Sequence, residues 1–206
     1  MDNIVQKRHK HYYGMEIDIK IIISTQTMFR ILEYGLDRSD RIMKEKIVNK
    51  MIDFYRGNRS DVRHFLKVYA YAQTIGRLEG LDGKTQDTLE IAAIVHDIAC
   101  PLCREKYGNT NGNHQEAESE PLLRIFLSEF ALPEEMEERI IYLVTHHHTY
   151  TNVEGLDYQI LLEADYLVNA DESQYSHEAI CKFRERVFKT KSGTHMLDSI
   201  YSLTEA

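Results

Sequence analysis

The sequence has no tryptophan and, among 206 residues, only three prolines, three cysteines and ten glycines. So few helix-breaking residues permit long helices and argue against a turn-rich β-sandwich. No hydrophobic run approaches the roughly 20 residues that cross a membrane, and no basic start with an apolar core resembles a signal peptide. An odd number of cysteines without a secretion signal is typical of free thiols in a reducing compartment. We therefore expect a soluble cytoplasmic protein without a membrane partner.

Acidic residues outnumber basic ones, with 33 Asp and Glu against 25 Lys and Arg and a net charge of −8. Nucleic acid is therefore not expected as the main partner, because binding to phosphates requires a positive field. A hydrophobic share of 43% and a charged share of 28% are typical of a globular protein. Ten histidines accompany the many carboxylates. These are the side chains that form nitrogen- and oxygen-ligated metal sites.

Residues 1–40 differ in pattern from the rest of the chain. A basic stretch from Lys7 to His11 precedes an alternation of polar and apolar residues from Glu16 to Ile21, which is typical of a strand. No chemical motif is recognisable in this part. We interpret residues 1–40 as an N-terminal extension and residues 41–206 as one domain with further helices at its C-terminal end.

From residue 41 onward the hydrophobic pattern predicts one helix after another. Gly57, Gly80 and Pro101 mark the ends of the first three, and Pro121 suits the first turn of a later helix. The expected helices cover residues 41–56, 61–80, 85–98, 121–130, 133–148 and 158–169, with two polar helices starting near 173 and 192. The sequence therefore predicts an all-α fold.

Several ionisable side chains fall on faces that should be buried. His64 shares one helix face with Val68 and other apolar residues, and His96 and Asp97 end an apolar helix. Asp165 lies within the apolar stretch of another helix. A buried carboxylate is costly unless it is paired, and no lysine or arginine lies in these stripes. A divalent cation would resolve the conflict because it binds imidazole and carboxylate lone pairs.

A run of three histidines, His146 to His148, ends the helix that starts near residue 133. At 100° per residue, His147 falls at the centre of the buried stripe marked by Ile140 and Val144, and its two neighbours flank it. This geometry favours His147 over His146 as a further metal ligand.

The ordered set His64, His96-Asp97, His147 and Asp165 resembles the HD-domain superfamily of metal-dependent phosphohydrolases. The resemblance extends from about Met51 to Asp171. The segments that carry it are DVRHFLKVYAYAQTIG, LEIAAIVHDIA and LVTHHHTY followed by YQILLEADYLVN. It implies an HD-domain helical bundle of about six to eight helices.

The resemblance also implies roles for individual residues. His64, His96, Asp97 and Asp165 would bind one metal ion, and Asp97 would bridge to a second ion where one is present. His147 matches the additional histidine of the dinuclear members. The remaining metal ligand of the dinuclear members would be His114 or Glu116 in this chain. A helix that starts at Pro121 would leave His114 in a loop, so this position stays open.

The resemblance further implies hydrolysis of a phosphoester of a small molecule, with a nucleotide as the expected substrate class. Water activated by one or two ions of Mn²⁺, Fe²⁺, Co²⁺ or Ni²⁺ would attack phosphorus, with Asp97 as the catalytic residue. Several family members carry a lysine shortly after the HD pair, and this chain has none there. Arg104 or Lys106 could contact the anionic substrate instead, or both could be solvated loop charges.

Two other functions and two structural questions stay open from the sequence. The HD scaffold also occurs in di-iron oxygenases, and a non-catalytic helical domain that binds metal and nucleotide is the other alternative. Cys100 and Cys103 form a CxxC that could be a redox pair, half of a zinc site, or two semi-buried thiols beside the active site. The oligomeric state is open, with a homodimer among the alternatives.

Overall fold

The computed structural model describes residues 6–12, 15–21 and 43–203, with side chains from residue 43 onward. The chain divides into two units, Met1–Ile42 and Met43–Ala206. In the first, strands β1 (Gln6–Tyr12) and β2 (Met15–Ile21) pair antiparallel, with Gln6 opposite Ile21. The alternation at residues 16–21 thus correctly predicts a strand. The remainder of the predicted extension lies outside the described residues.

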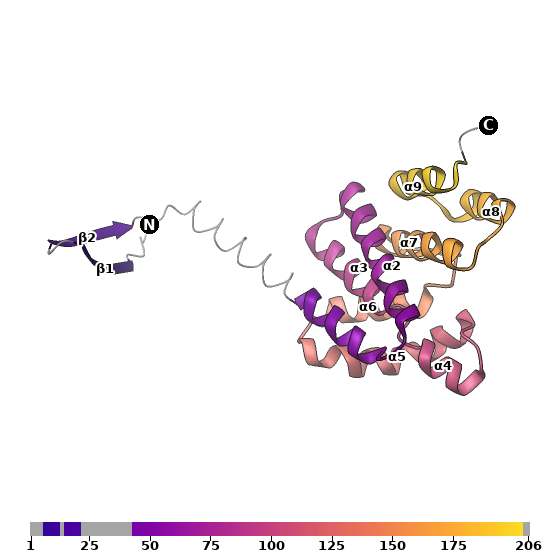
Figure 1. Cartoon of the computed structure of the whole chain (residues 1–206), viewed down its shortest axis with the longest axis horizontal. Helices are drawn as coiled ribbons and strands as arrows, with labels where there is room; N and C mark the ends of the chain where they lie inside the picture. The colour runs from indigo at the N-terminus through magenta and orange to yellow at the C-terminus, as the bar shows by residue number, and fades with distance from the viewer. Residues whose placement is uncertain (1–5, 13–14, 22–42, 204–206) are drawn as a thin grey trace. The chain divides into compact units, whose positions relative to one another are not determined.

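The second unit is entirely helical from residue 43 to 203, which confirms the predicted all-α domain (Figure 1). A helical segment at 43–54 is followed by eight α-helices. They are α2 (Arg59–Leu78), α3 (Gly83–Val95), α4 (Cys100–Tyr107), α5 (Gly112–Leu127), α6 (Glu134–His146), α7 (Leu156–Glu172), α8 (His177–Val187) and α9 (Lys191–Tyr201). No helix within the described part of the chain is long and apolar enough to cross a membrane.

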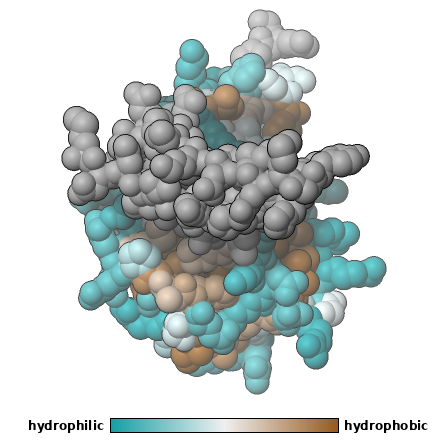
Figure 2. All heavy atoms as spheres, turned by 90° about the vertical axis from the view of Figure 1, so that its left-hand side faces the viewer, coloured by the Kyte–Doolittle hydropathy of each residue, from teal (hydrophilic) through white to brown (hydrophobic). Residues whose placement is uncertain are grey.

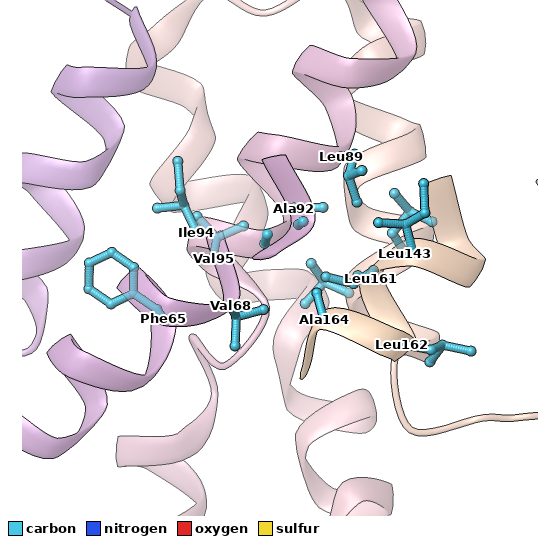
Figure 3. Packing of buried hydrophobic residues seen from close by; sticks show 14 of the residues in the cluster. Phe65, Val68, Leu89, Ala92, Ile94, Val95, Leu143, Leu161, Leu162 and Ala164 are labelled. Carbon is cyan, nitrogen blue, oxygen red and sulfur yellow. The ribbon is translucent and has the colours of Figure 1, made fainter. Parts of the chain in front are cut away.

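Helices α3 and α7 form the centre of this unit. Both are apolar around most of their circumference, and α3 packs against α2, α6 and α7. Figure 3 shows buried side chains that these four helices contribute to the core. The core residues labelled there are Phe65, Val68, Leu89, Ala92, Ile94, Val95, Leu143, Leu161, Leu162 and Ala164. Helices α8 and α9 lie at one end of the unit, and α4 and α5 at the other (Figure 1).

The coloured part of the surface in Figure 2 is mainly hydrophilic, with hydrophobic residues among the hydrophilic ones. This agrees with the composition, because apolar atoms always form part of a protein surface. The exposed large hydrophobic residues of the second unit include Leu78 and Ile125.

The prolines contradict two of the predicted boundaries. Pro101 does not follow a helix that runs to Ile98: α3 ends at Val95, and Pro101 lies in the first turn of α4, which the sequence did not predict. Pro121 does not start a helix but lies inside α5. Its missing N–H leaves the carbonyl of Ala117 without a helical partner, and both residues are exposed, so water can hydrate that carbonyl.

Buried carboxylates of the core show how this chain satisfies such groups. Glu90 on α3 is fully buried and contacts the ammonium of Lys44 at 2.6 Å. Glu163 on α7 is equally buried and accepts hydrogen bonds from the backbone N–H groups of Lys189 and Thr190. Each of these carboxylates therefore has a cation or several N–H donors from the protein itself.

Candidate metal centre

Four core helices bring the predicted metal ligands to one place. His64 comes from α2, and His96 and Asp97 from the turn directly after α3. His147 follows the last residue of α6, and Asp165 lies in the middle of α7. The turn after α3 is held by Tyr55, whose hydroxyl donates to the backbone carbonyl of Asp97 at 2.6 Å.

His64, His96 and Asp165 form a first group of ligand atoms. The Nε2 atom of His64 lies 3.2 Å from Nε2 of His96 and 3.2 Å from Oδ1 of Asp165. The Nε2 atom of His96 is 3.4 Å from the same carboxylate oxygen. With metal–ligand bonds of about 2.1 Å, neighbouring ligand atoms lie roughly 3 Å apart, so these spacings suit one ion.

Asp97, His147 and His148 form a second group, in which one atom from each lies within 4.8 Å of the other two. Asp97 faces both groups. Its Oδ2 atom lies 3.4 Å from Nε2 of His64, and its Oδ1 atom lies 3.6 Å from Nε2 of His147. One carboxylate therefore has an oxygen on each side, which is the geometry of a bridging ligand.

Three imidazoles are oriented by hydrogen bonds from their outer nitrogens. The Nδ1 atom of His96 donates to the carbonyl of Ala93 at 2.9 Å, and that of His147 donates to the carbonyl of Val144 at 2.7 Å. The Nδ1 atom of His64 donates to a carboxylate oxygen of Glu172 at 2.8 Å. Each ring consequently directs the Nε2 lone pair inward, as metal-binding histidines do.

The charges of the site support a metal ion as well. Apart from imidazoles, no basic side chain of the described residues contacts Asp97 or Asp165, in contrast to Glu90 with its lysine. The Nε2 atoms of His147 and His148 are buried and have no hydrogen-bond partner in the structure. Inward lone pairs, two carboxylates and two unpartnered ring nitrogens form a donor set that fits one or two divalent cations.

The pKa shifts describe how protons would compensate the same charge. Burial alone would lower the pKa of His64, but the hydrogen bond to Asp165 and the charge of Asp97 raise it to about 10. Burial would raise the pKa of Asp165, yet its hydrogen bonds with His64 and His96 hold it well below the usual range. Burial and the neighbouring His147 lower the pKa of His148 to about 4, so His148 is neutral at pH 7.

The structure also places the three other candidate ligands of the sequence analysis, His146, His114 and Glu116. His146 does not reach the cluster: its ring stacks on Tyr142 at 4.3 Å, and its Nδ1 donates to the carbonyl of that residue. The expectation of a loop at His114 is wrong, because His114 lies in the first turn of α5 and stacks on Tyr107. Glu116 accepts hydrogen bonds from the backbone N–H of His148 and the hydroxyl of Thr149.

A pocket of about 800 Å³ opens onto this cluster. Arg104 lines the pocket, and the Nη1 atom of its guanidinium donates to Oδ2 of Asp61 at 2.9 Å. Lys106 does not line it: the Lys106 ammonium is directed to Glu118 on α5. Because residues two positions apart lie about 200° apart on a helix, the two cations of α4 face different directions. Arg104 therefore lies in the pocket wall, and Lys106 does not.

The two cysteines of the CxxC are buried free thiols. Cys100 lines the pocket and donates to Oε1 of Gln115 at 3.2 Å, and burial raises its pKa. Burial also raises the pKa of Cys103. Thiols that stay protonated and packed correspond to the structural alternative rather than to a redox pair.

Glu172, which the sequence analysis did not select, orients His64. Its two carboxylate oxygens contact Nδ1 of His64 at 2.8 Å and the ammonium of Lys67 at 2.7 Å. Partial burial would raise its pKa, but these hydrogen bonds lower it, so the group is a carboxylate at neutral pH. Glu172 lies seven residues after Asp165, two helical turns along the same face of α7.

We expect the variant Glu172→Gln to bind metal on the order of 10- to 100-fold more weakly than wild type, because the amide holds the His64 ring less firmly. Titration with Mn²⁺ followed by calorimetry measures this change. The matched control is Asp171→Asn on the adjacent residue, whose side chain is 76% exposed and does not contact His64. Equal affinity for Mn²⁺ in all three proteins would contradict the role of Glu172.

Comparisons with known proteins agree with this architecture. The family model of the HD domain matches residues 62–183. A crystal structure described as a predicted HD superfamily hydrolase from an uncultured Thermotogales bacterium has a similar fold, with a TM-score of 0.57 and 21% identity. The match covers 77% of this chain and 85% of that chain. No curated protein matches the sequence. Since the family model spans more than half of the chain, including every residue of the cluster, the protein belongs to the HD domain family.

Proposed function

We propose that the protein is a metal-dependent hydrolase that cleaves a phosphoester of a small molecule, and that this molecule is a nucleotide. The observation that carries the proposal is the buried cluster around Asp97, which exposes inward lone pairs to a pocket large enough for a small substrate. The hydrolase description of the structural neighbour points in the same direction.

His64, His96 and Asp165 would hold one ion, and His147 and His148 a second, with Asp97 between them. Mn²⁺, Fe²⁺, Co²⁺ and Ni²⁺ suit this set better than Mg²⁺, because four of its six side chains are imidazoles. Bound ions of this kind neutralise phosphoryl charge and make water nucleophilic near neutral pH. The protein's own contribution is to orient these side chains through Glu172, Ala93 and Val144.

The pocket supplies the contacts that bind the substrate. Arg104 can place one guanidinium nitrogen on a phosphoryl oxygen while it keeps its pair with Asp61. Of the two cluster carboxylates, Asp97 is the better placed to orient a nucleophile, because its side chain is 20% exposed and that of Asp165 is 6% exposed. The same pocket wall holds the amide of Gln115. The NH₂ group of Gln115 donates to the carbonyl of Thr110 and its Oε1 atom accepts from Cys100, so this amide is held in the pocket wall by the protein itself.

Elemental analysis of the purified protein, followed by a phosphatase screen with the metal found, tests the proposal. We expect one or two ions per chain and release of inorganic phosphate from nucleotides. A metal-loaded protein that releases phosphate from no nucleotide or sugar phosphate would contradict it. Oxygen consumption by the reduced iron-loaded protein would then favour a di-iron oxygenase, and tight nucleotide binding without turnover would favour a non-catalytic domain.

A further inference from the structure

Four aromatic residues form one side of the pocket, and we call them the aromatic wall: Tyr150, Tyr166, Tyr175 and Phe183. Phe183 of α8 stacks on Tyr166 of α7, with ring centroids 3.6 Å apart and planes 5° apart. Tyr150 contacts the edge of Phe183 at 5.1 Å, and Tyr175 lies 5.8 Å from Tyr166. Segments after α6, within α7 and before and within α8 thus contribute to one aromatic surface.

The wall consists of a packed base and two exposed rings. Tyr166 is only 6% exposed, whereas Tyr150 is 41% and Tyr175 is 43% exposed. The stacked pair of Tyr166 and Phe183 therefore supports two rings that remain in contact with water along the pocket. Aromatic surface in a concave site is typical of a ligand contact, because its burial by a ligand is favourable.

The wall adjoins the metal cluster. Asp165 and Tyr166 are consecutive on α7, and both line the pocket. Tyr150 follows His148 by two residues, and both line the pocket. A molecule of nucleotide size can therefore touch the wall and the cluster together.

The charges of the pocket limit the number of phosphates. Among the described residues that line it, Arg104 is the only lysine or arginine, and Asp61 already pairs with it. Asp61 and Glu172 add negative charge at the same opening. Asp61 and Glu172 already pair with Arg104 and Lys67, so the described pocket lining has no further lysine or arginine for a triphosphate chain, whereas a single phosphoryl group would need only the metal cluster and Arg104.

We propose that the aromatic wall is a ring-binding subsite, in which a nucleobase stacks on Tyr150 and Tyr175 while a single phosphoryl group reaches the metal cluster. The inference rests on the proposed function and narrows it to nucleoside monophosphates, as opposed to sugar phosphates and nucleoside triphosphates. Stacking of a base on an aromatic side chain strengthens binding by about 10-fold or more.

A pair of substrates that differ only in the base tests the subsite. Adenosine 5′-monophosphate and ribose 5-phosphate share the same ester, so the ratio of their kcat/KM values reports the base contact alone. We expect a ratio of about 10 or more in wild type, mainly through KM. The ratio should fall towards one in Tyr150→Ala and Tyr175→Ala and be retained in Tyr175→Phe. The control Ile200→Ala removes a side chain that is 47% exposed outside the pocket lining and should keep the wild-type ratio.

Calorimetric titration with adenosine, which has no phosphate, separates the subsite from catalysis. We expect adenosine to bind to wild type and the affinity to fall by about 10-fold in Tyr175→Ala. Equal kcat/KM values for the two esters, unaffected by the tyrosine variants, would overturn the subsite while the hydrolase assignment stands. Binding of adenosine that depends on the tyrosines, without phosphate release from any ester, would support the subsite and overturn the hydrolase. Preference for adenosine triphosphate over the monophosphate would overturn the limit to one phosphate.

Discussion

Replacement of Asp97 by asparagine is expected to remove bound metal and hydrolytic activity together. The two oxygens of Asp97 face opposite groups, at 3.4 Å from His64 and 3.6 Å from His147. Asparagine keeps the size of the side chain, but it removes the negative charge and replaces one acceptor oxygen by an NH₂ group. The residue can then no longer bridge the two groups of ligands as a carboxylate. We expect activity to fall by on the order of 1000-fold or more.

Elemental analysis and phosphate release measure the two effects, and circular dichroism checks the fold. The control is Asp61→Asn, which removes another carboxylate of the same pocket. The carboxylate of Asp61 pairs with Arg104 and is not one of the cluster ligands. This control should keep its metal. Unchanged metal content in Asp97→Asn would show that the cluster does not bind the ion through this residue.

A second pair of variants uses adjacent histidines to locate the same site. His147→Gln should lose metal, whereas His146→Gln should keep it, because His146 stacks on Tyr142 and its Nδ1 bonds to a backbone carbonyl. Both substitutions change the same residue type at the end of α6. Because His147 is fully buried and His146 only half-buried, circular dichroism must first show that both variants are folded, and loss of metal from folded His147→Gln alone then reports the cluster.

The periodicity of the helices accounts for the residues that the sequence predicted well. His64 and Asp165 lie on buried faces of amphipathic or apolar helices, and a repeat of 3.6 residues identifies such faces without a structure. His147 was separated from His146 by the same geometry, and the two rings indeed face different surroundings. Helix periodicity therefore located the side chains that point into the core.

The residues that the sequence left open or did not select lie near the ends of helices or in short helices. His148 follows the last turn of α6, so the direction of its side chain depends on the turn and not on the helical repeat. Arg104 and Lys106 could not be separated because helix α4 was not predicted, and the two residues diverge only on a helix. Glu172 could have been found, since it shares a face of α7 with Asp165, but its contact with His64 depends on how α2 and α7 pack.

Removal of the metal is expected to make the protein's stability strongly dependent on pH. In the metal-free protein the pKa of His64 rises from 6.5 to about 10, so its stabilising contribution is complete below pH 6.5 and is lost as pH rises towards 10. Asp97 and Asp165 have pKa values below 3.8, so their contribution is present above that pH and lost only on acidification. The pKa of His148 is lowered to about 4, so this residue adds stability as pH rises from about 4 to 6.5, and the metal-free protein should be most stable near pH 6.5.

A bound metal ion should have the opposite dependence, because protons and metal compete for the same lone pairs. The ion stabilises the folded state by RT ln(1 + [M]/Kd), and Kd falls as the imidazoles lose their protons. The difference in Tm between metal-loaded and chelator-treated protein should thus grow from pH 6 to pH 9. With several kcal/mol of stabilisation and about 2–4 °C per kcal/mol for a chain of this size, it should reach about 10 °C.

Thermal unfolding followed by circular dichroism at pH 6, 7, 8 and 9, with Mn²⁺ or with EDTA, measures this difference. In His64→Gln the metal-free Tm should vary less between pH 6 and pH 9, because one of the two imidazoles with a raised pKa is gone and only His147 keeps one. His146→Gln should behave like wild type, since this residue lies outside the cluster. A difference in Tm that stays constant over this range would mean that the ion does not replace protons on the buried imidazoles. The cluster would then carry its charge by protonation alone.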